Sequence, residues 1–216
     1  MRRTALSLFA LTTYAALTAS AQNQAAPPAR AQAPTTPSAR AQTPTIPPAA
    51  QQIAAAVLPL PEAMRAGAAV LGYDAAVRLV QLRAGTNQMT CLADDPRDDR
   101  FHVACYHDSL DPFMARGREL RAQGVQGEAV DSTRYADVAA GRIRVPPVAS
   151  LYSLTGPAGS FDAATGTVRG ARALFVVYIP FATSESTGLS AVPQEGAPWI
   201  MHPGTARAHI MFIPRM

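Results

Sequence analysis

The chain has 216 residues and a formal net charge of +4, but its excess positive charge lies near the N-terminus. Four of its arginines precede residue 51, whereas all fifteen acidic residues follow it, together with fifteen arginines. Residues 51–216 are therefore close to neutral, which argues against a nucleic-acid partner because such a partner requires a basic face. The chain contains no lysine, which excludes the usual Schiff-base and lysine-nucleophile chemistries.

The first 21 residues have the pattern of a secretory signal peptide. A basic start at Arg2 and Arg3 precedes a mostly apolar stretch over residues 5–17, and Ala19-Ser20-Ala21 forms a small-x-small cleavage site. The apolar stretch is too short for a transmembrane helix, and no other stretch reaches the roughly 18 apolar residues that a span needs. We therefore expect a secreted protein, periplasmic or extracellular, with no membrane span after signal cleavage.

Residues 22–50 are rich in Ala, Pro, Thr and Gln and contain a near-repeat at 30–37 and 40–47. Seven of these 29 residues are proline, which favours extended polyproline II structure over a packed core. This composition predicts a disordered spacer, with a tether to the cell wall or to a partner as the alternative. Residues 51–216 are long enough for a single globular domain with one core.

The predicted elements of this domain begin with an alanine-rich helix over residues 51–57, which Pro59 ends. Short strands follow over residues 68–71, 77–83, 89–93 and 101–106. Two helices come next: one follows Asp111 and ends before Gly124, and a weaker one runs from Asp131 to Ala140 and is ended by Gly141. The C-terminal part returns to strands over residues 148–154 and 173–179, with a closing hairpin over 199–213.

Three of these segments carry specific expectations. Asp111 is the predicted N-cap of its helix, with Pro112 in the first helical position, and the apolar face of this helix covers one face of a sheet. Residues 173–179 are apolar throughout, which predicts a central strand buried on both faces. Residues 156–167 and 181–196 are predicted to be exposed loops.

Strands that follow one another without regular helix alternation indicate the α+β class. We predict an antiparallel sheet of about five to seven strands, with two or three helices packed mainly on one face.

The two cysteines, Cys91 and Cys105, lie in adjacent predicted strands that flank a polar loop. An exported chain with two cysteines favours one intramolecular disulfide, because disulfides persist in oxidising compartments. Such a bond would close a loop of about 15 residues and contribute roughly 3 kcal/mol in the chain-entropy model. Two free buried thiols, or one intermolecular bond, are the alternatives.

The candidate ligand or metal site is drawn from His102, His107, Asp108, His202 and His209. Imidazole and carboxylate are common metal ligands, but no HxH or HExxH spacing is present. His102 and His107 are five residues apart, so in an unbroken strand they point to opposite faces. The metal and any catalytic residue stay unassigned, and no motif for a cofactor is found, so we expect none.

Several short motifs resemble those of uncharacterised secreted bacterial proteins. They comprise Leu-Arg-Ala-Gly-Thr-Asn at 82–87, Cys-Leu-Ala-Asp at 91–94, Cys105, Gly-Ala-Pro-Trp-Ile-Met at 196–201 and Pro-Gly-Thr-Ala-Arg-Ala-His-Ile-Met at 203–211. The similarity covers roughly residues 78–213 and excludes the leader and spacer. The resemblance implies export and the extent of the domain, and it implies no activity.

Two hypotheses for function are left open by the sequence. The first is a non-catalytic exported binding module whose partner is a small molecule, a wall component or another protein. The second is an exported hydrolase or metalloprotein that uses His107 or His209 with nearby carboxylates.

Overall fold

A computed structural model describes residues 44–194 and 196–214 of the chain. The predicted signal peptide, and the predicted spacer as far as residue 43, lie outside the described residues. No helix within the described ranges is long and apolar enough to cross a membrane.

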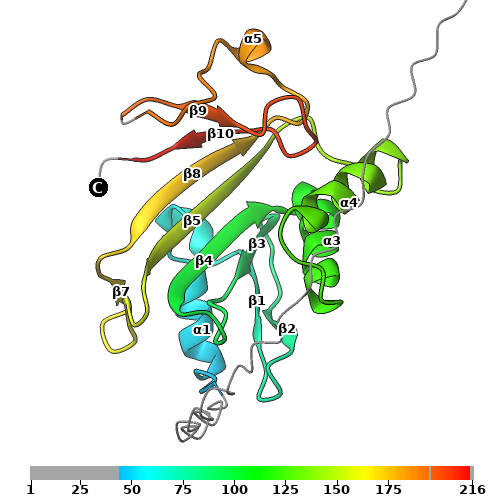
Figure 1. Ribbon diagram of the computed structural model, residues 1–216. Helices are drawn as coiled ribbons and strands as arrows, with labels where there is room; N and C mark the ends of the chain where they lie inside the picture. Colours follow the sequence, from blue (N-terminus) through cyan, green and yellow to red (C-terminus); the bar gives the residue numbers. More distant parts are fainter. Residues whose placement is uncertain (1–43, 195, 215–216) are drawn as a thin grey trace, which may run out of the picture. The chain divides into compact units, whose positions relative to one another are not determined.

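An eight-stranded sheet organises the structure, in the order β2-β1-β3-β4-β5-β8-β10-β9 (Figure 1). Only β1 and β3 pair in parallel, and every other neighbouring pair is antiparallel. The α+β class and the antiparallel sheet are confirmed, although the strand count is larger than predicted. The strands of this sheet are β1 Ala69–Tyr73, β2 Leu79–Arg83, β3 Met89–Leu92, β4 Arg100–His107, β5 Ala149–Pro157, β8 Arg172–Tyr178, β9 Trp199–Met201 and β10 His209–Phe212.

The helices lie on both faces of the sheet, which differs from the expectation that they pack mainly on one. Neighbouring residues of a strand point to opposite faces, and β4 shows the division directly. The Cys105 sulfur lies 3.2 Å from the carbonyl oxygen of Ala56, whereas the Tyr106 hydroxyl donates to Asp111 on the other side. We call these two sides the α1 face and the α3 face. The helices are α1 Ala49–Ala56, α2 Glu62–Arg65, α3 Asp111–Ala122, α4 Glu128–Ala139 and α5 Ser184–Thr187.

The predicted disulfide is confirmed and lies in the core of the α1 face. Cys91 and Cys105 are direct partners in the antiparallel register of β3 and β4, with 3.9 Å between their Cα atoms. Both cysteines are fully buried among side chains of α1 and β1. Gln52 of α1 is also buried, and its amide both donates to and accepts from the backbone of Tyr73. These bonds attach α1 to the sheet. The helix begins at Ala49, two residues before the expected domain boundary.

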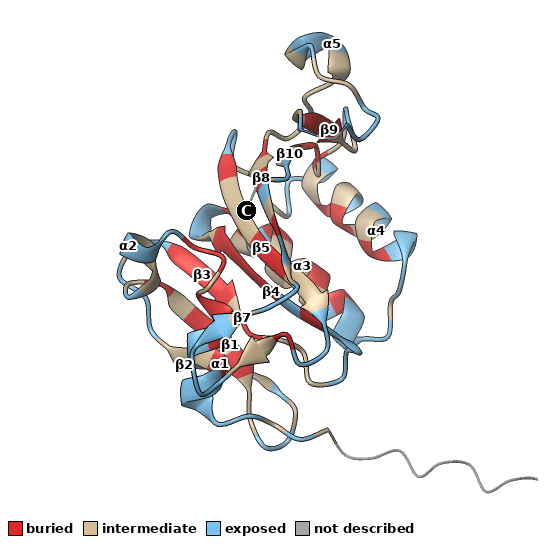
Figure 2. Cartoon of the chain, turned by 90° about the vertical axis from the view of Figure 1, so that its left-hand side faces the viewer, coloured by how far each residue is buried: buried red, intermediate tan, exposed pale blue. Residues whose placement is uncertain are grey.

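Strand β8 is central in the sheet order, but the prediction that it is buried on both faces is wrong. Phe175 of β8 and Phe212 of β10 point to the α1 face and are 37% and 39% exposed. The reason is the short length of α1, whose eight residues contact β1, β2 and β4. Figure 2 shows the contrast between the buried strands near α1 and the more exposed β8 and β10.

Helix α3 begins at Asp111, one residue before the predicted first helical position at Pro112, so Asp111 is not its N-cap. A short 3-10 helix over Asp108–Leu110 leads into α3, and Leu110 takes the cap position without a side-chain bond. The Asp111 carboxylate instead accepts hydrogen bonds from Tyr106 and Arg118. Gly124 follows the helix with a φ of +84°, which agrees with its predicted role after the C-terminus.

The predicted loops contain further elements, and the C-terminal hairpin is confirmed. Residues 156–167 include the end of β5 and β6 Phe161–Asp162, which pairs with β7 Thr167–Val168 as a small second sheet. The 181–196 loop holds the single-turn helix α5, whose N-cap is Thr183. Strands β9 and β10 pair antiparallel, and β10 also pairs with β8.

Candidate anion-binding site

The candidate residues on β4 are placed as the strand period predicts. His102 points to the α3 face, and its Nδ1 lies 2.8 Å from the Thr155 hydroxyl. His107 ends the strand with its Nδ1 2.8 Å from the Ser109 hydroxyl. The next residue, Asp108, accepts a hydrogen bond of 2.6 Å from the Thr90 hydroxyl. Each of these side chains is thus held by a different local partner.

His202 and His209 lie together near the β9–β10 hairpin, with 5.7 Å between their ring centroids. The His209 ring stacks on Tyr178, and its Nδ1 donates to the carbonyl oxygen of Arg207 at 2.6 Å. Burial lowers the pKa of His209 to about 4, and the charge of Arg207 acts in the same direction. His209 is therefore neutral near pH 7.

The structure does not bring the predicted site residues into one centre. Among the described residues, no group of three or more His, Cys, Asp or Glu side chains is arranged to hold a metal ion. In the same part of the chain, the recorded side-chain hydrogen bonds of His107 and His209 do not involve a carboxylate.

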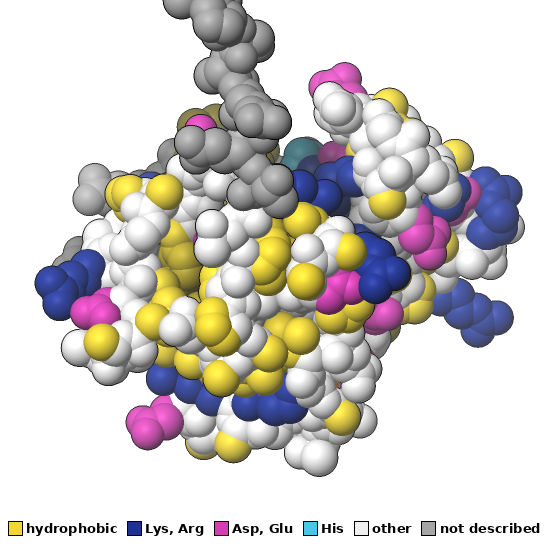
Figure 3. Space-filling model, turned by 90° about the horizontal axis from the view of Figure 1, so that it is seen from below, with side chains coloured by type: hydrophobic (Ala, Val, Ile, Leu, Met, Phe, Trp, Pro, Cys, Tyr) yellow, Lys and Arg dark blue, Asp and Glu magenta, His cyan; other side chains and the backbone are white. Residues whose placement is uncertain are grey.

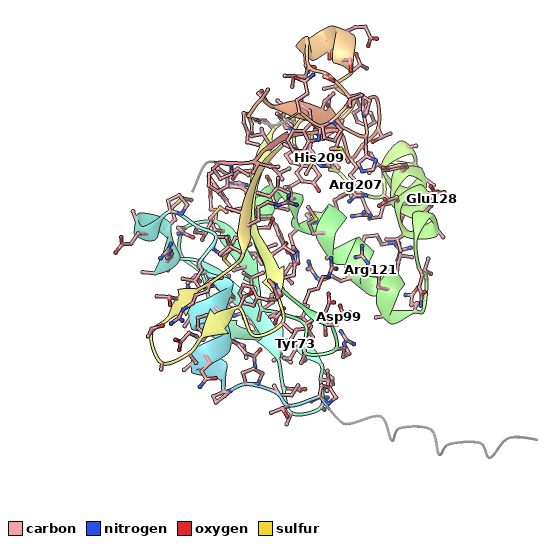
Figure 4. The ribbon with its side chains drawn as sticks, turned by 60° about the vertical axis from the view of Figure 1, so that its left-hand side comes forward. Tyr73, Asp99, Arg121, Glu128, Arg207 and His209 are labelled. Carbon is pink, nitrogen blue, oxygen red and sulfur yellow. A yellow bond between two sulfur atoms is a disulfide. The ribbon has the colours of Figure 1, made fainter. Side chains whose placement is uncertain are left out.

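A group that the sequence analysis did not identify lies on the α3 face. It consists of four arginines that come from α3, from α4 and from the segment before β10, and we call it the arginine cluster: Arg118, Arg121, Arg134 and Arg207. In Figure 4, Arg121 lies between Arg207 and His209 on one side and Asp99 and Tyr73 on the other.

Gly117 of α3 makes room for two of these guanidinium groups. A Cβ atom at this position would lie 3.2 Å from Nη1 of Arg134 and 3.3 Å from Nη1 of Arg121. The Arg134 side chain is only 5% exposed and lies over the Phe113 ring, with 4.2 Å from its Cζ to the ring centroid. A glycine inside a helix is unfavourable by about 1 kcal/mol relative to alanine, so its presence here is explained by this close approach.

The arginine cluster contains more positive charge than its carboxylates balance. Asp131 accepts from Nη2 of Arg134 and, at 2.6 Å, from Nη1 of Arg207. Asp111 pairs with Arg118 at 3.0 Å. Arg121 has no hydrogen bond or ion pair recorded to any residue that the structure describes.

The pKa values of neighbouring bases report this positive field. Arg121 is exposed, but partial desolvation lowers its pKa, and the charges of Arg134, Arg207 and Arg118 lower it further against the opposing effect of Asp131. Burial likewise lowers the pKa of His202, with Arg207 and Arg134 adding to the effect. Groups with perturbed pKa values are frequent at functional sites, although structural networks of charges shift pKa values as well.

The arginine cluster borders an open cavity, which we call the α3 cleft. This cleft has a volume of about 940 Å³, and Arg118 and Arg121 contribute to its wall. Its other walls come from the first four strands, the loop between β3 and β4 and the residues that follow α3. They present apolar, aromatic and imidazole side chains (Tyr73, Val77, Leu79, Leu92, His102, Ala104 and Val125) and the charged side chains Arg78, Asp95, Arg97 and Asp98. Val77 has a φ of +59°, which is a rare conformation for a β-branched residue.

A second cavity, of about 310 Å³, lies between α1 and the β6–β7 hairpin. Its wall includes the stacked rings of Phe101 and Phe161, and apolar side chains gather on the side seen from below (Figure 3). Two of the carboxylates at this cavity, Asp95 and Asp98, pair with arginines. Both carboxylates also line the α3 cleft, but that cleft has in addition Arg121, for which no partner is recorded among the described residues, and it is therefore the candidate site.

One sequence signal could have identified the α3 cleft. Arg121 follows Gly117 by four residues, so the two share a helix face, and a small residue at such a spacing allows close approach. Arg121 is nevertheless solvent-exposed, as the polar side of a helix that covers a sheet would be. Arg134 and Arg207 are brought in by tertiary packing, since Arg207 and its partner Asp131 are 76 residues apart.

No family model, no curated protein and no solved structure matches this chain. The chemistry of the site therefore follows from its own residues. Guanidinium groups present a planar fork of donors that fits carboxylate and phosphate oxygens in bidentate geometry. A cleft with apolar walls and an uncompensated guanidinium can bind an anionic group and pack the rest of the ligand against the sheet.

Proposed function

We propose that the protein is a non-catalytic exported module that binds a small anionic ligand in the α3 cleft. The observation that carries this proposal is Arg121, which lies exposed at the wall of the α3 cleft and has no recorded partner among the described residues. Arg118 lines the same cleft, and the charges of Arg134 and Arg207 act on Arg121 from beside it. An anion at this place would relieve the repulsion among the guanidinium groups. Leu79, Leu92 and Val125 supply apolar surface for the body of the ligand.

The expectation of export supports a ligand that is met outside the cytoplasm. The signal-peptide pattern and the buried Cys91–Cys105 disulfide agree with an oxidising compartment. A small molecule or a fragment of a wall component that carries a carboxylate or phosphate has the required chemistry. Binding without turnover is the simplest use of a site whose uncompensated group is a guanidinium, because arginine is a poor proton donor or acceptor near pH 7.

Calorimetric titration of the purified mature chain with a set of small anions tests this proposal. Benzoate, glucuronate and phenyl phosphate are suitable because each combines one anionic group with a ring. We expect saturable binding of at least one of them, weakened about tenfold or more in Arg121→Gln, because a charged hydrogen bond is lost. Arg142→Gln is the matched control, since Arg142 is exposed and pairs with Asp137 rather than with the arginine cluster. Equal binding by wild type and Arg121→Gln would overturn the proposal.

A further inference from the structure

We infer that the end of the sheet at β9 and β10 binds Cu(I) through the Met201 thioether and the imidazoles of His202 and His209. None of these three residues lines the α3 cleft. The metal site therefore goes beyond the proposed function and does not depend on it.

The backbone at the end of β9 brings two adjacent side chains to one corner of the sheet. Met201 is the direct partner of His209 in the antiparallel register, so these two residues point to the same face, with roughly 4.5–5.5 Å between their Cβ atoms. In an unbroken strand, His202 would point to the opposite face. Its φ of +51° breaks the strand, and its ring centroid lies 5.7 Å from that of His209. Such a conformation is rare for a residue with a side chain, and rare conformations cluster at ligand sites.

The spacing of the two imidazoles suits a shared metal ion. When two imidazole nitrogens bind one ion at about 2.0–2.1 Å, their ring centroids lie roughly 5–6 Å apart. The observed separation of 5.7 Å falls in this range, and the rings are tilted by 45° rather than stacked on each other. Within the described ranges, the recorded hydrogen bonds of His202 use its backbone and not its ring. Both ring nitrogens of His202 are therefore available to a ligand.

The surroundings of His209 leave one nitrogen free to bind a metal. Its Nδ1 lies 2.6 Å from the carbonyl oxygen of Arg207, its neighbour in Figure 4, and its ring stacks on Tyr178. Because a carbonyl oxygen only accepts, Nδ1 carries the proton and Nε2 carries the lone pair. A bond from the second ring nitrogen to a backbone carbonyl is a common way of orienting a metal-binding imidazole.

The donors and the nearby charges select a soft monovalent cation. Thioether and imidazole are neutral donors, and thioether sulfur binds Cu(I) in preference to hard cations such as Mg²⁺ and Ca²⁺. The charges of Arg207 and Arg134 act on His202, and Asp131, which pairs with both arginines, opposes them. Repulsion from these guanidinium groups is twice as large for a divalent ion as for a monovalent one. A site completed by methionine also agrees with the lack of a group of three His, Cys, Asp or Glu side chains among the described residues.

The single tryptophan of the chain can report binding at this site. Trp199 lies on β9 two residues before Met201, on the same face and about 7 Å away along the strand. Cu(I) supplied as its bicinchoninate complex, with ascorbate and without oxygen, should transfer to the mature chain at one ion per chain and change the Trp199 fluorescence. Zn(II) should bind more weakly than Cu(I), because it gains little from a thioether and is repelled more strongly.

Three variants assign the donors. Met201→Leu keeps the side-chain volume and removes the sulfur, so it should weaken Cu(I) binding about tenfold or more and leave Zn(II) binding unchanged. His202→Asn tolerates the left-handed backbone and should weaken the binding of both ions. Met211→Leu is the matched control, because Met211 lies on the same face but opposite Trp199 rather than His209. It should bind Cu(I) as the wild type does.

Several results would overturn the Cu(I) site. They are no transfer of Cu(I) to the mature chain, equal Cu(I) affinity in wild type and Met201→Leu, Zn(II) binding as tight as Cu(I) binding, and a loss of Cu(I) confined to Met211→Leu. Circular dichroism verifies that each variant is folded, and if His202→Asn does not fold, the comparison of Met201→Leu with Met211→Leu still decides. Arg121→Gln should bind Cu(I) normally, so the metal site and the α3 cleft are tested separately.

Discussion

The two faces of the sheet differ in how their buried polar and charged groups are paired. On the α1 face, the disulfide is covered by alanine, valine and methionine side chains. The buried amide of Gln52 donates to the carbonyl oxygen of Tyr73 and accepts from its backbone N–H. On the α3 face, Arg134 is buried with its Nε unpartnered among the described residues, and Arg121 adds a further uncompensated charge. The buried groups of the α1 face are paired, whereas the α3 face keeps charges that our proposal assigns to the binding of an anion.

Removing the carboxylate of Asp131 should have the largest effect on stability. Asp131→Asn leaves the buried Arg134 without its charged partner and also frees Arg207, so we expect a loss of roughly 3–5 kcal/mol in the free energy of unfolding. Urea denaturation followed by circular dichroism measures it. Asp162→Asn is the control, because Asp162 pairs with an exposed arginine at 3.5 Å and should change stability far less. Similar losses in both variants would mean that Asp131 has no special role.

Removing the disulfide tests the α1 face. The double variant Cys91→Ala, Cys105→Ala should lose roughly 3 kcal/mol, because the unfolded chain regains the freedom of a loop of about 15 residues. Anion binding should stay unchanged, since Cys91 and Cys105 point away from the α3 cleft. Urea denaturation and titration with phenyl phosphate on the same preparations measure the two properties. A variant of normal stability, or one that loses binding while still folded, would contradict the division between the faces.

Acid should weaken the β9–β10 end of the α3 face through His209. The pKa of this imidazole falls from 6.5 to about 4 in the folded protein, mainly by burial. Between these values the unfolded chain binds the proton and the folded chain does not, so stability is complete above pH 6.5 and decreases as the pH falls toward 4. We expect a loss of roughly 2 kcal/mol between about pH 7 and pH 5.

Denaturation curves at a series of pH values measure this dependence, with His209→Gln as the comparison. His202 and His102 also have lowered pKa values and contribute with the same sign, so the variant should flatten the dependence without abolishing it. An unchanged slope in His209→Gln would show that His209 is not the group responsible.

The features that the sequence predicted correctly depend on local pattern. The antiparallel register of Cys91 and Cys105 follows from two short strands around a polar loop, and helix α3 follows from Pro112 and Gly124. Asp111 failed as an N-cap because Tyr106 and Arg118, which approach through tertiary packing, compete for its carboxylate.

The candidate site depends on packing that no local pattern records. The apolar run of β8 predicts burial on both faces, but the sequence does not show that α1 is too short to cover this strand. Phe175 on the α1 face of β8 is exposed for that reason. Arg118 and Arg121 were visible as charges on a helix, yet their meaning depends on Arg134 and Arg207, which reach them only in the fold. Histidine and acidic residues can be recognised in a sequence as candidate metal ligands, whereas no comparable spacing of arginines marks an anion site.

The stability of Arg121→Gln tests the central claim most directly, because it requires no knowledge of the ligand. If Arg121 is an uncompensated charge, its removal should leave the free energy of unfolding unchanged or raise it by up to about 1 kcal/mol at low ionic strength, after solvent screening is considered. High salt should erase this gain. A loss of more than about 1 kcal/mol at both ionic strengths would show that Arg121 is a structural residue with a satisfied charge, and would contradict the assignment of the α3 cleft as an anion-binding site.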